Sequence, residues 1–113
     1  MLAGAHRSAA EDIEAAIAAL ASTPRAARLI IEGAWGAAIH WLAFGCQTKH
    51  GQHQDSHARL GTFLRAQGAT TTADNWERLD QLRQGSWYGS RIDPQAQQAA
   101  VDVLREIRAW ATS

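Results

Sequence analysis

The 113-residue sequence has one cysteine, two prolines, one tyrosine and no excess of charge of either sign. The lone Cys46 excludes an internal disulfide and a multi-cysteine zinc site. Because Cys46 lies in an apolar helical pattern, we expect a buried, unreactive thiol. No apolar run approaches the roughly 20 residues that cross a bilayer, and the first residues turn acidic where a signal peptide is apolar. We therefore expect a cytoplasmic protein without membrane contact, and its length predicts one domain over residues 1–113.

The charged residues exclude one simple mode of nucleic-acid binding. Eleven basic residues balance eleven acidic ones, so the chain cannot coat nucleic acid through net charge alone. Ten of the eleven cations are arginine, whose planar guanidinium favours bidentate contacts with phosphates or carboxylates. The sequence also lacks a GxSxG motif, a glycine-rich phosphate loop and a paired-carboxylate motif. Nothing in it therefore supports a hydrolase, a kinase or a dinucleotide-binding enzyme.

Apolar residues recur at helical spacing in five segments, and no segment alternates with the period of a strand for long enough to form one. Local signals mark several helix ends: Ser8 and Glu11 form a capping box, Thr23 and Asp55 are expected caps, and Gly51 is an expected terminator. The predicted helices cover about Ala9–Ala21, Pro24–Lys49, Ser56–Ala66, Ala73–Gln84 and Pro94–Trp110. The predicted fold class is all-α, an up-and-down bundle of four to five helices.

The long second helix contains three glycines, Gly33, Gly36 and Gly45. Each is about 1 kcal/mol less favourable than alanine inside a helix. Small residues allow another backbone to come close, so we expect this helix to lie at the centre of the bundle.

The stretch Leu79–Ile92 is the least ordinary part of the chain. A helical pattern is expected to stop at Gly85, and two adjacent rings and two arginines surround this break, namely Arg83, Trp87, Tyr88 and Arg91. In one interpretation the rings close the end of the core, and Arg83 pairs with Asp80 or with an acid on the last helix. In the other they form a surface with the guanidinium groups that suits phosphates and bases. The sequence leaves both open.

Other candidate sites are weaker. The spacing of His50, His53 and His57 allows a metal site in a histidine-rich loop, but a solvated loop is the simpler interpretation. His40 is expected to be a core histidine with one hydrogen bond. Arg83 could stabilise charge on a reacting phosphate, whereas Tyr88, with an ordinary pKa near 10, is a poor general base at neutral pH.

Three segments together resemble a known family. The first, IIEGAWGAAIHWLAFGC, has Trp35 and His40 in an aromatic-small-x-x-x-His pattern; the second, HQDSHARLGTFL, has His57 and Phe63 in a second pattern. The third, LDQLRQGSWYGSRIDPQAQQAAVDVLREIRAW, has Leu-Arg before an aromatic-Tyr-Gly turn and a final amphipathic helix. In this order the segments, from about Pro24 to Trp110, resemble a HEPN domain, a small all-helical nucleotide-binding module of prokaryotes and higher eukaryotes.

The resemblance carries expectations about function. Many HEPN members are metal-independent ribonucleases, often toxins, that use an arginine followed after four to six residues by a histidine, usually across a homodimer interface. Here Arg83 matches the arginine, but residues 88–90 hold no histidine, and Tyr88 stands nearest to its place. Other members lack the pair and act as non-catalytic partners of a minimal nucleotidyltransferase, and in some toxins a nearby tyrosine is adenylylated by that partner, a role that Tyr88 would match only at a different spacing.

The leading interpretation is therefore a HEPN-like homodimer that binds nucleotide or RNA, in a toxin–antitoxin-like context with a nucleotidyltransferase partner, and that needs no cofactor or metal. The expected contact surface comprises Arg83, Trp87, Tyr88 and Arg91, with His57 and Arg59 alongside. One alternative is a metal-independent ribonuclease in which Arg83 works with Tyr88 or His57. Another is a metal-binding bundle that uses the histidine loop.

Overall fold

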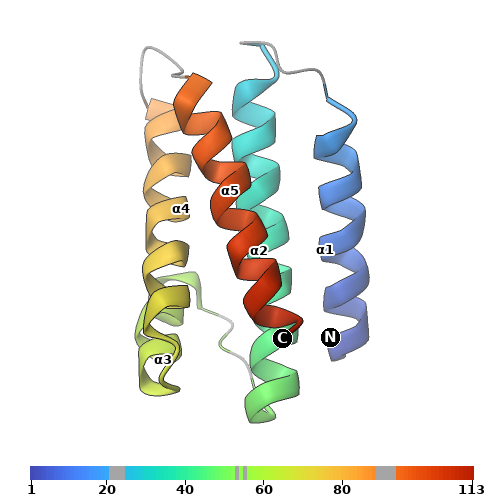
Figure 1. Ribbon diagram of the computed structural model, residues 1–113, viewed down its shortest axis with the longest axis vertical. Coiled ribbons are helices and arrows are strands. Elements are labelled where there is room, and N and C mark those ends of the chain that lie inside the picture. The colour runs from blue at the N-terminus through green and yellow to red at the C-terminus, as the bar shows by residue number, and fades with distance from the viewer. Residues whose placement is uncertain (21–24, 53, 55, 89–93) are drawn as a thin grey trace.

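The computed structural model describes residues 1–20, 25–52, 54, 56–88 and 94–113. These residues form five α-helices and one 3-10 turn, and they include no strand. The elements are α1 (Ala3–Ala18), α2 (Ala27–His50), η1 (His57–Arg59), α3 (Leu60–Ala66), α4 (Thr70–Tyr88) and α5 (Pro94–Ala111). The four long helices run alternately up and down, and α3 lies beside the start of α4 (Figure 1). The predicted all-α bundle is confirmed.

Helix α2 forms the centre of the bundle, as its composition predicts. It packs against α1, α4 and α5, and most of its apolar residues are buried. Trp41, Ile31 and Leu42 of α2 are among the largest fully buried side chains, together with Leu79 of α4 and Ile107 of α5. Each such side chain contributes about 1.5–3 kcal/mol by leaving water, so the bundle is organised around α2.

Two glycines of α2 lie where neighbouring helices come closest. A Cβ atom at Gly33 would collide with Ile17 of α1, and one at Gly45 would collide with Trp110 and lie 3.1 Å from the Cα atom of Ala111 in α5. The helix accepts the conformational cost of glycine because any side chain would separate it from α1 and α5. This contact confirms the expected close approach.

The end of α2 is also where the sequence predicts it. Gly51 has a φ of 75°, in the left-handed region that glycine adopts without a Cβ clash, and its amide donates to the carbonyl of Gln47 at 2.9 Å. The start of α5 at Pro94 agrees with the predicted position. The expected caps Thr23 and Asp55 lie outside the described residues.

The predicted start of the first helix is wrong. Helix α1 begins at Ala3, its N-cap is Leu2 without a side-chain hydrogen bond, and Ser8 lies inside the helix. His6 is buried against α2, where it contacts His40, and Arg7 and Glu11 form an ion pair at 3.0 Å. The additional residues at the start of α1 pack against α2, and this packing outweighs the local cap signal at Ser8, which is worth about 1 kcal/mol.

The predicted bounds of the fourth helix are also wrong. Helix α4 begins at Thr70 rather than Ala73, and it continues through Gly85 to Tyr88 instead of ending at Gly85. A hydrogen bond joins the last turn of α4 to α2: Arg28 Nε of α2 donates to the Ser86 carbonyl at 2.9 Å. The third helix likewise begins later than expected, since the 3-10 turn η1 replaces its first turn.

Helix α2 is long and apolar enough, by length and composition, to cross a membrane. The expectation that no segment has this property is therefore not met. The core helix of a soluble protein can have the same length and composition, and 56% of the most apolar stretch of α2 is buried inside the fold. Helix α2 packs against three other helices, α1, α4 and α5.

Candidate functional site

Four side chains of α4 follow one another at helical spacing and face α2, where two further side chains meet them. We call this surface the α2–α4 face; it consists of Glu32 and Trp35 of α2 and of Trp76, Asp80, Arg83 and Trp87 of α4. Because residues three and four positions apart share one side of a helix, the four α4 residues form a continuous row. Arg83 and Trp87 of the expected contact surface therefore do lie together.

Glu32 joins the arginine and the exposed indole of this face. Its Oε2 atom accepts a hydrogen bond from Arg83 Nε at 2.7 Å and another from Trp87 Nε1 at 2.7 Å. Burial by itself would raise the pKa of Glu32, but the two hydrogen bonds and the Arg83 charge outweigh that effect, so the pKa is lowered. Glu32 is therefore a carboxylate at neutral pH, and it holds the last turns of α4 against α2.

Arg83 is fixed on two sides and open on a third. Its guanidinium carbon lies 4.0 Å from the centre of the Trp35 ring, a cation–π contact that orients the guanidinium plane. Within the described residues its Nη1 and Nη2 atoms have no hydrogen-bond partner, and neither is a buried polar atom. Its side chain is 31% exposed. Arg83 thus presents an oriented pair of donors to solvent.

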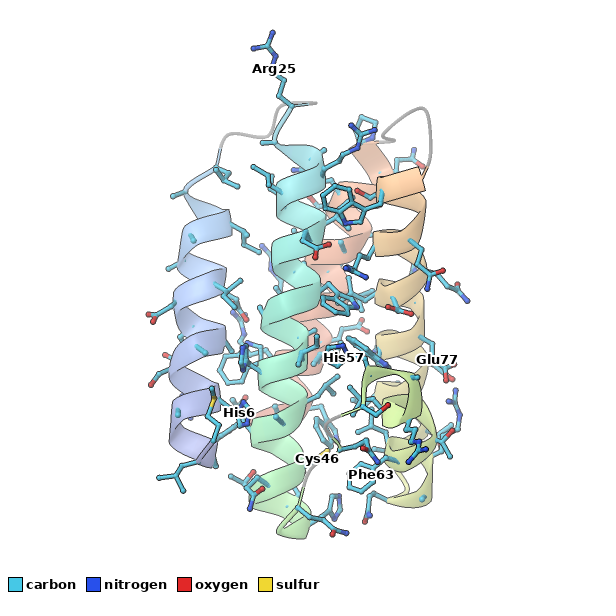
Figure 2. All side chains as sticks on the ribbon, turned by 180° about the vertical axis from the view of Figure 1, so that it is seen from behind. His6, Arg25, Cys46, His57, Phe63 and Glu77 are labelled. Atoms are coloured by element: carbon cyan, nitrogen blue, oxygen red, sulfur yellow. The ribbon has the colours of Figure 1, made fainter. Side chains whose placement is uncertain are left out.

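The Trp35 ring is the centre of an aromatic cluster beneath Arg83. Its Nε1 donates to Asp80 Oδ1 at 2.9 Å, and it stacks on Trp76 at a centroid distance of 5.8 Å. The His57 ring meets Trp35 edge-on at 5.0 Å, and it lies between α2 and α4 (Figure 2). Arg83 and His57 therefore contact the same indole although they come from different elements.

Trp87 is on the surface rather than in the core. Half of the residue, 51%, is exposed, although its indole N–H is satisfied by Glu32. The ring is therefore held in one orientation while much of its surface stays in water. This position disagrees with the interpretation in which Trp87 closes the end of the core. Arg83 pairs with Glu32 of α2, so the expected pairing with Asp80 or with an acid on the last helix is wrong as well.

Of the other expected contact residues, the structure describes His57 and Arg59 in full. Arg91 and the side chain of Tyr88 lie outside the described residues. His57 is exposed beside Trp35. Arg59 is exposed at the end of η1, and no contact described for it joins it to Arg83 or Trp87. The described part of the surface therefore depends on Arg83 and Trp87, with His57 at its border.

A pocket of about 370 Å³ adjoins the face between η1, α3 and α4. Its polar wall includes His57, Glu77, Asp80, Gln81 and Gln84, and Trp76 is among its apolar lining residues. Gln84 also donates to Asp80 Oδ2 at 3.1 Å, which fixes that carboxylate further.

The histidine-loop alternative has no support in the described residues. No three histidine, cysteine, aspartate or glutamate side chains described by the structure gather closely enough to hold a metal ion. His53 lies outside that part of the chain, and His57 turns to the tryptophan cluster instead.

Sequence reasoning missed Glu32, although a signal for it exists. Glu32 is the only acidic residue of α2, an otherwise apolar helix. A lone carboxylate in such a helix needs a partner, because burying an unpaired charge is costly. Its partner could not be named from the sequence, since Arg83 is 51 positions away.

Comparison with known proteins finds no relative. No protein-family model, no curated protein and no solved structure matches this chain. A function must therefore be inferred from the residues of the α2–α4 face and from the three short motifs.

Proposed function

We propose that this protein is a binding protein for nucleotide or single-stranded RNA, and that the α2–α4 face is its contact surface. The observation that carries the proposal is the state of Arg83. Glu32 and Trp35 hold its guanidinium in place, and its Nη1 and Nη2 atoms have no partner in the described part of the chain. A guanidinium held in this way suits a phosphate group, because two of its donors match two phosphate oxygens.

The neighbouring ring provides the second half of the interaction. Trp87 is half-exposed and its orientation is set by Glu32. An exposed indole offers a stacking surface for an unpaired base, and such stacking contributes about 1–3 kcal/mol per base. A phosphate at Arg83 and a base on Trp87 are features of a single strand, since the bases of a duplex are not free to stack on a side chain.

The proposal is tested with a fluorescently labelled single-stranded RNA, titrated with wild type and Arg83→Gln. We expect the variant to bind at least about tenfold more weakly, because one charge-assisted contact contributes about 1.5–3 kcal/mol. Arg78→Gln is the matched control: it removes the same charge from an exposed position of α4 that does not contact Glu32 or Trp35. Equal binding by all three proteins would contradict the proposal, and circular dichroism would verify that each variant is folded.

One observation favours a ribonuclease as a second candidate. Arg83 and His57 contact the same Trp35 indole, so an arginine and a histidine do lie near each other despite the missing histidine after Arg83. Cleavage of labelled RNA in the presence of a chelator tests this candidate. Activity that is lost in both Arg83→Ala and His57→Ala would favour the enzyme over the binding protein, and absence of cleavage would exclude it.

The resemblance to HEPN domains extends the proposal to a cytoplasmic homodimer with a nucleotidyltransferase partner in a toxin–antitoxin-like context. The exposure of Leu29, at 60%, supports a protein contact near the start of α2. Light scattering of the purified chain tests the dimer. Co-purification with a nucleotidyltransferase encoded beside it tests the partner.

A further inference from the structure

The α2–α4 face carries more negative than positive charge. Of its six residues, Glu32 and Asp80 are acidic and Arg83 is basic. The next cation of α2, Arg28, uses its Nε atom on the Ser86 carbonyl. Arg25 points away from the end of the bundle (Figure 2). Among the six residues of this face, a ligand phosphate would therefore meet one guanidinium, that of Arg83, which already has a carboxylate beside it.

The position of that carboxylate limits the charge of the ligand. Glu32 occupies the Nε side of Arg83 at 2.7 Å, so an anion has only the Nη1 and Nη2 end available. An anion bound there would share one guanidinium with the Glu32 carboxylate, and at such short range like charges repel near a protein surface. The repulsion grows with ligand charge. A phosphodiester carries one negative charge, whereas a terminal phosphate carries about 1.5 to 2 at neutral pH.

We infer that Glu32 is a specificity-determining residue that makes the Arg83 site prefer the internal phosphodiesters of a single strand over terminal phosphates and free nucleotides. This inference rests on the proposed function and specifies its ligand. Arg83 attracts both kinds of phosphate, and Glu32 penalises the more highly charged kind. Glu32 is kept ionised by its hydrogen bonds to Arg83 and Trp87, so the penalty persists across the neutral pH range.

Glu32→Gln separates charge from geometry. The glutamine amide oxygen can still accept from Arg83 Nε and Trp87 Nε1, so the variant keeps the acceptor and removes the negative charge. Glu106→Gln is the matched control, since it makes the same substitution at an exposed position of α5. The ligands are adenylyl-adenosine with a 5′-hydroxyl, the same dinucleotide with a 5′-phosphate, and ATP. Binding is measured by calorimetry at low salt, where repulsion is least screened.

In wild type we expect the 5′-phosphate to leave the affinity unchanged or to lower it, and ATP to bind most weakly. In Glu32→Gln we expect ATP and the 5′-phosphorylated dinucleotide to gain roughly tenfold more affinity than the 5′-hydroxyl form. Glu106→Gln should resemble wild type, and adding Arg83→Gln to Glu32→Gln should remove the gain. A wild type that prefers the 5′-phosphate or ATP would overturn the inference, as would equal gains for all ligands.

The failure of this inference differs from the failure of the proposed function. If neither wild type nor Glu32→Gln binds any of these ligands or the longer RNA, the proposed function fails and the inference fails with it. If RNA binding depends on Arg83 but the ligand preference does not depend on Glu32, only the inference fails. Binding of ATP that is absent in wild type and present in Glu32→Gln would support the inference directly.

Discussion

His6 of α1 and His40 of α2 face each other with their Nδ1 atoms 3.0 Å apart. Their rings are tilted by 40° at a centroid distance of 5.2 Å, and His6 is buried. One Nδ1 must donate and the other accept, so the contact cannot survive if both rings are fully protonated. Burial also lowers the pKa of His40 below its ordinary value. The contact therefore needs at least one neutral ring, and the lowered pKa favours a neutral His40 in the folded protein.

We predict that the bundle loses stability as the pH falls below about 6.5, the ordinary histidine pKa. The pKa of His40 is depressed in the folded state, so the unfolded chain binds the proton more tightly. The stabilisation is complete above the unfolded pKa and is lost as the pH falls toward the folded one. Urea unfolding at pH 7.5 and pH 5.5 measures it. His40→Gln should reduce the pH dependence, and His50→Gln, at an exposed position, should leave it unchanged.

Gly85→Ala should stabilise the protein by about 0.5–1 kcal/mol, because alanine is the better helix former. The position lies inside α4, and a Cβ atom there would meet nothing within 4 Å. Urea unfolding measures the change. Destabilisation would show instead that the helix stops at Gly85, as the sequence alone suggests.

Gly45→Ala should have the opposite sign, although it makes the same chemical change in another helix. A Cβ atom would collide with Trp110 and press on the backbone of Ala111. We expect destabilisation of about 1–3 kcal/mol, the range for overpacking a core. A melting temperature unchanged from wild type would mean that α5 can move away from α2 at little cost.

Glu14 of α1 links this helix to α2 and α5, so its removal should lower the stability of the protein. It accepts hydrogen bonds from the Trp41 indole of α2 and from Arg108 of α5, the latter at 2.6 Å. Glu14→Ala leaves the buried Trp41 N–H unsatisfied, so we expect a loss of about 1–3 kcal/mol. Glu11→Ala, one turn earlier, removes only an exposed ion pair with Arg7 and should change stability by less than about 0.5 kcal/mol. Similar losses of stability in both variants would contradict this role of Glu14.

Cys46 should be unreactive in the folded protein. Burial raises the pKa of its thiol to about 11, so little thiolate exists at pH 8. We expect very slow reaction with a disulfide reagent at that pH and rapid reaction after unfolding in guanidinium. Fast labelling of the native protein would mean that α2 opens readily.

The end of α4 illustrates the limit of local signals. Gly85 weakens a helix by about 1 kcal/mol, which is why the sequence suggests a break there. Contacts made by the residues beyond it outweigh that cost, through Ser86 with Arg28 and Trp87 with Glu32. The predicted start of α1 is wrong for the same reason. Ser8 offers a local cap, but burial of His6 extends the helix toward the N-terminus, past Ser8.

The sequence by itself determined the all-α class, the central place of α2, the end of α2 at Gly51, the start of α5 at Pro94 and the burial of Cys46. These features follow from periodicity and from backbone preferences that act over a few residues. Only the tertiary structure decided that Glu32 holds both Arg83 and Trp87, which lie 51 and 55 positions away along the chain. Local patterns cannot specify such a pairing, because it depends on how α2 and α4 align when their apolar sides pack.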